Sequence, residues 1–423
     1  MKIAVLKETV SNENRVATTP DVVKKYVATG HSVTIEKGAG VAAGYTDAAY
    51  KAAGASIAAT AKAACGGSEI ILHVQPLTPK QLSDVPAKAT TIGLMDPFNA
   101  DDLIKAGAKQ KVTSFAMELV PRITRAQSMD VLSSQSNLAG YRAVLDAAYS
   151  YGRAFPMMMT AAGTVAPAKV FVMGAGVAGL QAIATAKRLG AVVSATDVRA
   201  AAKEQVQSLG GSFVMVEDEE TKAAETSGGY AKEMSAAYKK KQVELIASTI
   251  AKQDVVITTA LIPGRPAPVL VSEDMVKTMK PGSVIVDLAA AQGGNCPLSE
   301  ADKVVKKHGV TIIGYTNLAS RIAADASALY AKNLLNFVNL ISDENGKLAI
   351  DWDDEIVKGA GMTHAGKAVN ERFGGAKKKT ATAKKKASAK KTVAKKKPAN
   401  TSKKTSAKRK AVKRTSNNSK KKV

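Results

Sequence analysis

Three glycines, Gly174, Gly176 and Gly179, form a G-x-G-x-x-G pattern directly after the short apolar run Val170 to Met173. In that order they suit a tight turn, a close approach of the backbone to a ligand, and close packing of the next helix on the strand. The free amides and positive dipole end at that helix start attract phosphate oxygens. The pattern therefore predicts a strand, turn and helix that bind the pyrophosphate of a dinucleotide.

An acid follows this unit at a telling distance. The helix is expected to end at Gly190, and a second strand should run from Ala191 to Thr196. Asp197 then stands 18 residues after Gly179, where the acid that bonds ribose hydroxyls belongs. A carboxylate repels a 2′-phosphate, so the sequence favours NAD over NADP. Arg199 leaves NADP open as an alternative, because a nearby guanidinium can accommodate that phosphate.

The positive charge of the chain is concentrated at its end. The 423 residues carry a net charge of +25, of which residues 376–423, with 21 Lys or Arg and no acid, supply +21, leaving +4 for residues 1–375. This end segment is rich in Lys, Ala, Ser and Thr and has no aromatic residue, so we expect it to be disordered. Its charge predicts non-specific, salt-sensitive contact with nucleic acid or anionic lipid. A solubilising segment without a dedicated partner is the alternative.

Cysteine, histidine and hydropathy patterns exclude several other classes. Cys65 and Cys296 are far apart and form no C-x-x-C, so neither a disulfide framework nor a zinc site is predicted. None of the four histidines pairs with a second ligand at metal spacing, and His31 and His308 are expected at helix ends, so we predict no metal. Apolar runs are too short to span a bilayer, and the first residues read as a strand instead of a signal peptide. We expect a cytoplasmic chain.

Alternating strand and helix patterns predict the fold class: α/β, with two Rossmann-like doubly wound parallel-sheet domains separated by a cleft, plus the basic C-terminal tail. A long helix from about Ser136 to Phe155 and a second from about Ser320 to Leu340 should link the two domains. A polar insertion, Glu217 to Lys241, is long enough to be functional or mobile. The expected segments are an N-terminal domain in 1–125 completed by about 341–373, a connecting segment in 126–160, a nucleotide-binding domain in 161–319, a returning helix in 320–340 and the tail in 376–423.

The predicted strands occur in two sets. Those of the first domain are Lys2 to Leu6, Ser32 to Glu36, Glu69 to Val74 and Thr90 to Gly93. Those of the second domain are Lys169 to Met173, Ala191 to Thr196, Ser212 to Val216, Val255 to Thr259, Ser283 to Asp287 and Thr311 to Tyr315. Ligands of such sheets bind at the carboxyl ends of the strands.

Longer segments add a resemblance that covers roughly residues 1–350. They resemble the NAD(H)-binding alpha-1 subunits of proton-translocating NAD(P) transhydrogenases, a family related to alanine dehydrogenase. Besides the glycine-rich unit, the matching segments are Arg125 to Val144, Phe155 to Val165, Gly228 to Met234, Thr258 to Leu270 and Lys280 to Ala290.

The resemblance implies an enzyme whose reaction is shared between chains. The soluble subunit holds NADH, a membrane partner carries a domain that holds NADP(H), and hydride passes directly between the two nicotinamides while protons cross the membrane. It also implies a homodimer, attached peripherally to the inner membrane through membrane-embedded transhydrogenase subunits.

The resemblance further implies a polar group beside the nicotinamide, formed by Arg122, Gln127, Asp130 and Ser133. Gln127 both donates and accepts, so it could hold the carboxamide and ribose, while Arg122 could bond Asp130 and Ser133 and so preorganise the ring. The reaction needs positioning and exclusion of water, with no proton acceptor. A plain helix start capped by Asp130 or Ser133 is the alternative.

The remaining implied contacts surround the nucleotide. Tyr230 corresponds to the tyrosine of a mobile loop that closes over it. One departure lies in DLAAAQGGN, where Ala291 stands in a region that often carries an acid. The implied NAD(H) contacts are Gly174, Gly176, Val177, Ala178, Gly179, Asp197, Val198, Arg199, Gly229, Tyr230, Ala260 and Leu261.

Two other functions remain in competition. An alanine dehydrogenase-like enzyme needs a base and a cation for the amino-acid carboxylate; here Gln75 occupies the expected lysine position and IGLMDPFNA has no histidine, although Arg15 remains. The other is an NAD-binding protein with a nucleic-acid-associating tail, but no folded reader module is evident.

Overall fold

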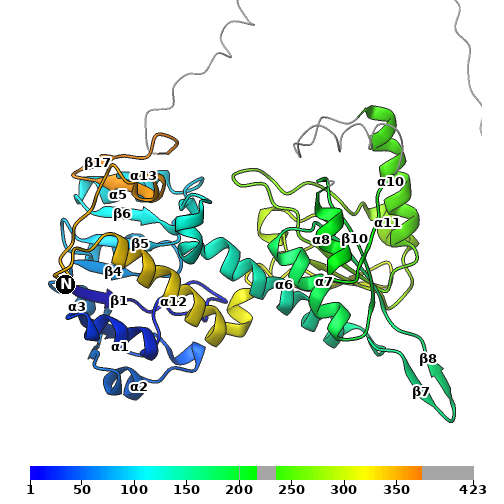
Figure 1. Ribbon diagram of the computed structural model, residues 1–423, viewed down its shortest axis with the longest axis horizontal. Helices are drawn as coiled ribbons and strands as arrows, with labels where there is room; N and C mark the ends of the chain where they lie inside the picture. Colours follow the sequence, from blue (N-terminus) through cyan, green and yellow to red (C-terminus); the bar gives the residue numbers. More distant parts are fainter. Residues whose placement is uncertain (200, 217–234, 374–423) are drawn as a thin grey trace, which may run out of the picture. The chain divides into compact units, whose positions relative to one another are not determined.

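The computed structural model describes residues 1–199, 201–216 and 235–373. The expected nucleotide contacts Gly229 and Tyr230, most of the polar insertion and the basic segment 376–423 lie outside the described residues. Residues 1–375 form one compact unit, in which two predominantly parallel sheets are visible (Figure 1). The predicted fold class, α/β with Rossmann-like parallel sheets, is confirmed.

The first sheet has the strand order β17-β16-β6-β5-β4-β1-β2-β3 among the described residues. Strands β1 to β6 are parallel, while β16 runs antiparallel to β6 and to β17. The order reverses direction between β1 and β4, which makes their carboxyl ends the switch point of this sheet. Its strands are β1 (Lys2–Val5), β2 (Ser32–Glu36), β3 (Ser56–Ala58), β4 (Ile70–Leu72), β5 (Thr90–Gly93), β6 (Thr113–Ala116), β16 (Gly361–His364) and β17 (Lys367–Ala368).

Helices cover this sheet and bury its apolar side chains. Tyr26 of α1 and Tyr330 and Phe337 of α12 belong to one core cluster with Ile70 and Leu72 of β4. The helical elements of this domain are α1 (Pro20–Ala28), η1 (Val41–Ala43), α2 (Asp47–Ala52), α3 (Ala61–Cys65), α4 (Pro79–Asp84), α5 (Asp101–Lys109), η2 (Met117–Leu119) and α13 (Glu355–Ala360).

The second sheet has the order β11-β10-β9-β12-β13-β15-β14 among the described residues. Its switch point lies between β9 and β12, which are parallel neighbours. Its strands are β9 (Lys169–Met173), β10 (Val192–Thr196), β11 (Ser212–Phe213), β12 (Val255–Thr258), β13 (Val284–Asp287), β14 (Val304–Lys307) and β15 (Val310–Ile313), and its helices are α7 (Val177–Arg188), α8 (Ala202–Ser208), α10 (Ala236–Ile250), α11 (Glu273–Thr278) and η4 (Ala290–Gln292).

The edge of this sheet differs from expectation. Val304–Lys307 forms β14, antiparallel to β15, where no strand was expected. His308 lies in the turn between these strands and not at a helix end, with φ of 50° followed by 80° at Gly309. Two successive residues with positive φ are typical of a two-residue hairpin turn. The expectation of a helix-end histidine is therefore wrong, and His308 instead bonds Glu273 at 2.8 Å.

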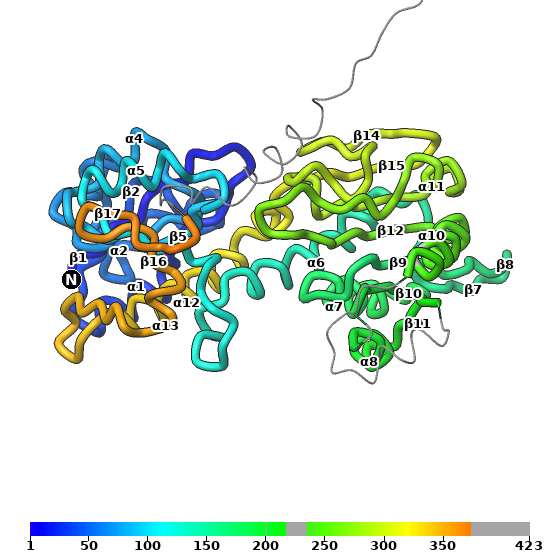
Figure 2. Tube along the Cα trace, turned by 90° about the horizontal axis from the view of Figure 1, so that it is seen from above, coloured from blue at the N-terminus to red at the C-terminus, as the bar shows by residue number. Residues whose placement is uncertain are grey.

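Two helices connect the domains. α6 (Val131–Ser150) contacts α12 on one side and α7, β12 and β13 on the other (Figure 2). It starts five residues before the expected Ser136, because Asp130 caps it by accepting the Ser133 amide at 2.8 Å. The chain returns from β15 through η5 (Ala319–Ile322) into α12 (Ala323–Leu340).

Three short elements complete the description. η3 (Thr124–Met129) precedes α6, and the hairpin β7 (Met158–Thr160) with β8 (Gly163–Val165) follows it. Among the described residues, no helix combines the length and apolar composition that crossing a bilayer requires.

Candidate nucleotide site

The glycine-rich turn has the geometry that its sequence predicts. Gly174 has φ of +105°, and a Cβ there would lie 2.4 Å from Oγ1 of Thr259. A Cβ on Gly179 would lie 1.8 Å from the carbonyl oxygen of Gly174, so this helix start packs directly on the turn. In contrast, a Cβ on Gly176 would meet nothing within 4 Å. Two glycines are needed for packing, and the third leaves space beside the backbone.

That space adjoins free hydrogen-bond donors. Gly176 is the N-cap residue of α7, and no side chain caps this helix start. The first amides of a helix lack intrahelical partners, and their dipole favours an anion. The start of α7 therefore fits a pyrophosphate.

Asp197 follows β10 and is held in place from two directions. Its carboxylate accepts the Ala175 amide at 2.7 Å and the Arg199 amide at 2.8 Å, and pairs with the Arg199 guanidinium at 3.0 Å. Burial alone would raise the pKa of Asp197, but the bonds from Arg199 and Ala175 lower it below its ordinary value. The acid is thus a fixed anion beside the turn, and Arg199 is engaged by it. Between them Val198 is 88% exposed.

A cavity of about 310 Å³ brings the two sets of predicted residues together. Its lining includes the α7 start and the polar residues Arg122 and Ser133, which are distant in sequence. Val177, Ala178 and Leu261, all implied contacts, line it as well. The lining residues are Arg122, Leu132, Ser133, Ser136, Ala139, Gly176, Val177, Ala178, Thr259, Leu261, Leu288, Tyr315, Thr316 and Leu318.

The predicted polar group is assembled only in part. Asp130 and Ser133 are joined twice, since the Ser133 hydroxyl also donates to the carboxylate at 2.6 Å. Within the described residues, Arg122 makes no hydrogen bond to Asp130 or Ser133, so that expected link is wrong: its side chain lines the cavity instead. Gln127 is exposed in η3 and, like Asp130, is not among the residues that line the cavity. The helix-cap role of Asp130 is observed.

The segment after β12 is fixed by a residue that sequence reasoning missed. The fully buried Asn295 accepts the Ala260 amide at 3.1 Å and donates to the carbonyl oxygens of Ala260 and Pro268 at 2.9 and 2.8 Å. It therefore holds Ala260 and the adjoining Leu261 at the cavity. The signal was the GGN that follows Ala291, an exposed residue of η4.

A second missed residue is Gly140 in α6. A Cβ at this position would lie 2.1 Å from the carbonyl oxygen of Ala178. The close approach of α6 to the start of α7 therefore depends on this glycine. A single glycine within a helical pattern gave no indication of that contact in sequence.

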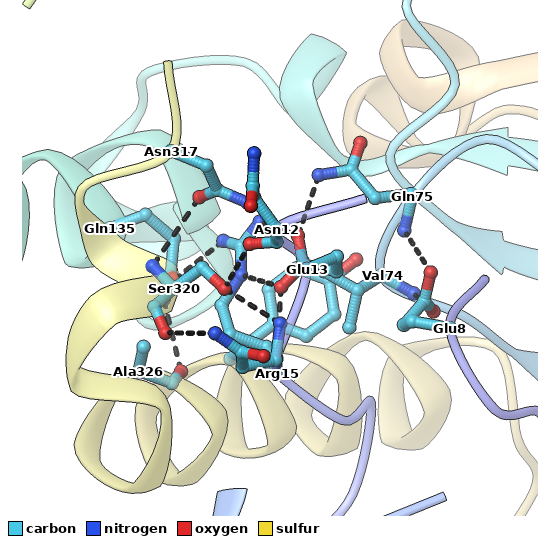
Figure 3. A network of polar contacts seen from close by, with 12 residues as sticks. Glu8, Asn12, Glu13, Arg15, Val74, Gln75, Gln135, Asn317, Ser320 and Ala326 are labelled. Atoms are coloured by element: carbon cyan, nitrogen blue, oxygen red, sulfur yellow. Dashed lines mark hydrogen bonds and ion pairs between the residues drawn. The ribbon is translucent and has the colours of Figure 1, made fainter. Parts of the chain in front are cut away.

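The first domain carries a polar network at its own switch point (Figure 3). Glu8, which follows β1, accepts the amides of Val74 and Gln75 at 2.6 and 3.2 Å. Glu13 and Arg15 form a buried ion pair of 2.6 Å, and Gln75 donates to Glu13 at 2.7 Å.

The two glutamates of this network have opposite pKa shifts. Burial raises the pKa of Glu8 to about 7. Burial also opposes ionisation of Glu13, but the hydrogen bonds and charge of Arg15 lower its pKa to about 2. Nearby, burial lowers the pKa of His73 to about 4, and its Nδ1 lies 2.8 Å from the Gln75 carbonyl oxygen. Glu13 is thus the anion that neutralises Arg15.

Metal-ligand geometry is absent from the stretch of chain that the structure describes. Within it, no group of three or more His, Cys, Asp or Glu side chains is arranged to hold an ion. Both cysteines are buried and free.

Comparisons with known proteins place both domains in one family. Residues 4–139 match the family model for the N-terminal domain of alanine dehydrogenase/PNT, and residues 143–371 match the model for its C-terminal domain. These matches end before the basic segment 376–423.

Individual relatives agree with the family models. The chain is 57% identical over 381 residues to the first of the chains that make up NAD(P) transhydrogenase subunit alpha in Rhodospirillum rubrum, covering 89% of this chain and 99% of the relative. It is 31% identical to alanine dehydrogenase of Methanococcus maripaludis, over 85% of this chain and 92% of that protein.

A solved transhydrogenase structure from Sinorhizobium meliloti has 53% identity and a TM-score of 0.80, covering 87% of this chain and 100% of that one. A solved L-alanine dehydrogenase has 26% identity and a TM-score of 0.74, covering 88% of this chain and 98% of that one.

Proposed function

The chain belongs to the alanine dehydrogenase/PNT family, and we propose that it is the NAD(H)-binding subunit of a proton-translocating NAD(P) transhydrogenase. It would transfer hydride directly between its own NADH and NADP⁺ held by a partner membrane subunit. The observation that carries this proposal is the cavity, which unites the start of α7 with Arg122 and Ser133. The 57% identity to a transhydrogenase subunit supports the same conclusion.

Each region of the cavity has a definite task in this proposal. When bound, NADH supplies the hydride from its dihydronicotinamide ring. The space beside Gly176 and the free amides of α7 would bind the pyrophosphate, and Asp197 would accept hydrogen bonds from the ribose.

The ring end of the cavity requires positioning more than acid–base catalysis. Arg122 and Ser133 line the cavity where they could hold the ring, while Leu132, Leu261 and Leu288 exclude water. Gln127 remains a proposed contact, made from η3 once the nucleotide is bound. No proton has to be accepted, since a hydride leaves one ring and enters another, so orientation is the main contribution of the protein.

The alternative of an amino-acid dehydrogenase acting alone is weakened by the first domain. Such an enzyme needs a free cation for the substrate carboxylate. The Arg15 guanidinium is engaged by Glu13, at 2.8 Å from Nε and 2.6 Å from Nη2, and by Gln135 at 2.8 Å from Nη1. Gln75, which cannot replace a lysine base, bonds the same glutamate. We expect no NAD reduction with alanine as substrate.

We also propose that the subunit is a homodimer attached to the membrane through its partner subunits. The stretch leading into and along β7 exposes three consecutive methionines, Met157, Met158 and Met159, at 59, 44 and 76%. Consecutive exposed apolar side chains are typical of protein interfaces. Sedimentation of the full chain should give the mass of a dimer.

The basic segment supports a second activity only as an accessory. Its 21 positive charges favour non-specific binding to nucleic acid or anionic lipid that collapses with added salt. Deleting residues 376–423 should abolish this binding and leave hydride transfer unchanged. Loss of hydride transfer in the deletion would contradict an accessory role.

The decisive test of the proposed function compares binding with turnover. The isolated chain should bind NADH more tightly than NADPH in a fluorescence titration. It should transfer hydride efficiently only after an NADP-binding membrane partner is added. Tighter binding of NADPH, or efficient turnover without the partner, would overturn the proposal.

Gln127 offers a sharper version of this test. Gln127→Asn shortens the side chain that would hold the carboxamide, so hydride transfer should fall much more than NADH affinity. Equal losses in both would mean that Gln127 serves affinity alone.

A further inference from the structure

We propose that Glu13 and Arg15 are positioning residues for hydride transfer, because they fasten both interdomain connections that form one wall of the nucleotide cavity. This inference rests on the proposed function, since it concerns the geometry of that same cavity. Figure 3 shows the pair at the centre of contacts from several separate segments.

The pair itself is buried and fully bonded. The side chains of Arg15 and Glu13 are 4 and 0% exposed. Nε and Nη2 of Arg15 donate to the two carboxylate oxygens at 2.8 and 2.6 Å, and the Arg15 amide donates to Oε1 at 2.9 Å. A bidentate pair of this kind has one geometry, so groups bonded to it are held at fixed positions.

One arm of the pair reaches the first interdomain connection, α6. Nη1 of Arg15 donates to Oε1 of Gln135 at 2.8 Å. The Gln135 amide in turn donates to the carbonyl oxygen of Ala326 in α12 at 3.2 Å. Arg15 therefore holds the start of α6 against the helix that brings the chain back.

The other arm reaches the second connection, between β15 and α12. Asn317 donates from Nδ2 to Oε2 of Glu13 at 2.8 Å. The next turn is held from the same segment, since the Asn14 amide donates to Oγ of Ser320 at 2.7 Å, and this hydroxyl donates to the Asn12 carbonyl oxygen at 2.8 Å.

The first sheet supplies the anchor. Oε2 of Glu13 also accepts Nε2 of Gln75, which lies shortly after β4, at 2.7 Å. One carboxylate oxygen thus joins the switch point of the first sheet to the connection from the second. Breaking it would release the connection without removing a core side chain.

Both fastened segments continue into the cavity wall. Gln135 lies between Ser133 and Ser136, and Asn317 lies between Thr316 and Leu318; all four neighbours line the cavity, whereas Gln135 and Asn317 do not. A shift of either fastened residue therefore moves residues that face the nucleotide. Displacements near 1 Å can cost about a hundredfold in rate when a reaction depends on alignment.

The experiment uses the full chain with Asn317→Ala, a half-buried position whose loss leaves the Glu13–Arg15 pair in place. The matched control is Asn370→Ala, another half-buried asparagine, which donates to the carbonyl oxygens of Gly359 and Gly361 at 3.3 and 3.0 Å. Both variants should lose similar stability. Only Asn317→Ala should slow hydride transfer, by roughly tenfold, with NADH affinity within about twofold of wild type.

Two additions separate positioning from a general structural role. Gln135→Ala tests the other arm and should slow transfer in the same way. Asn317→Asp places a second carboxylate against Glu13 and should slow transfer more than Asn317→Ala, because like charges repel. Equal rates in Asn317→Ala and wild type, or equal slowing in Asn370→Ala, would overturn the inference.

Amide hydrogen exchange makes the outcome independent of the proposed function. Exchange in 315–320 and 132–136 should be faster in Asn317→Ala than in Asn370→Ala, and unchanged exchange there would overturn the inference. If the wild-type chain transfers no hydride with its partner, the proposed function fails, while faster exchange in these two segments would still establish the fastening.

Discussion

In the second domain the carboxyl ends of β9 and β12 border a cavity of about 310 Å³, whereas in the first domain the ends of β1 and β4 are joined by Glu8. Both places are switch points of doubly wound sheets, where ligands usually bind. The second keeps space beside Gly176 and leaves the amides of α7 without a side-chain cap. The first is filled by its own charged side chains.

The difference shows how one architecture supports two tasks. Glycines and uncapped amides leave a switch point ready for an external anion, while Glu13 supplies an internal anion for Arg15. A filled switch point can no longer take a substrate carboxylate, but it can fasten neighbouring segments. The following variants test this contrast, beginning with the largest expected effect.

Removing one member of the internal pair should cause the largest change. Arg15→Met leaves the Glu13 carboxylate buried without its counter-ion, so the free energy of unfolding should fall by about 3–5 kcal/mol in urea denaturation. The double variant Glu13→Gln with Arg15→Met has no unpaired charge and keeps an acceptor for Gln75 and Asn317. It should recover at least half of the loss; a double variant as unstable as the single would contradict a charge-based cause.

The glycine-rich turn should respond differently at its two inner glycines. Gly179→Ala drives a Cβ into the Gly174 carbonyl, so both stability and NADH affinity should fall, the affinity by about a hundredfold. Gly176→Ala meets no protein atom within 4 Å, so unfolding should change by less than about 0.5 kcal/mol while NADH binding weakens. Titration calorimetry and thermal unfolding separate the two. Wild-type affinity in Gly176→Ala would mean that the ligand does not approach there.

Asp197→Asn should change cofactor preference more than stability. Losing the charge removes the strong acceptor for the ribose and the ion pair with Arg199, so NADH affinity should fall by about tenfold and NADPH affinity should rise. The control is Asp254→Asn, an acid that accepts the Lys169 amide at 2.9 Å and pairs with Lys280 at 3.0 Å just before β12. The control should bind both nucleotides normally; an unchanged preference in Asp197→Asn would contradict the ribose role.

The smallest effect concerns pH and the first switch point. The pKa of Glu8 is raised from 4.5 to about 7, so the folded protein holds a proton that the unfolded chain has released, and this contribution to stability is lost as pH rises from about 4.5 to 7. Glu8→Gln should remove that loss, on the order of 1 kcal/mol because the side chain is half-buried. Urea unfolding at pH 5 and pH 7 provides the measurement.

Other groups of the network do not obscure this comparison. The pKa of Glu13 is lowered to about 2, so its contribution is lost only as pH falls from about 4.5 toward 2. The pKa of His73 is lowered to about 4, so its contribution is lost as pH falls from about 6.5. His73 is present in both proteins and cancels in their difference. A parallel pair of curves between pH 5 and 7 would contradict the assignment to Glu8.

Prediction from sequence succeeded where local pattern and structure coincide. The apolar run before Gly174 and the period of the following helix place β9 and α7, and the spacing to Asp197 places the acid beside the turn. β14 escaped prediction because an edge strand with alternating exposure carries little apolar signal. The start of α6 was misplaced because the polar residues around the Asp130 cap are as typical of a turn as of a helix start.

The candidate site was predicted by residue but not by arrangement. Resemblance pointed to Arg122 and Ser133, and the cavity contains both; it gave no means of knowing that Arg122 bonds neither Asp130 nor Ser133 among the described residues. Gly140 and Asn295 act through contacts with residues 38 and 35 positions away, the carbonyls of Ala178 and Ala260. Contacts of that kind leave no periodicity to detect.

The sequence by itself determined the dinucleotide turn, because glycine conformation, helix start and acid spacing are local properties of one strand–helix–strand unit. It also determined the charge of the final segment. Only the tertiary structure decided that Arg15 is neutralised by Glu13 and that the pair fastens Gln135 and Asn317, residues 120 and 304 positions away from their partners. The physical reason is that a buried charge must find its counter-ion in space, and chain folding, not spacing along the sequence, sets which groups meet.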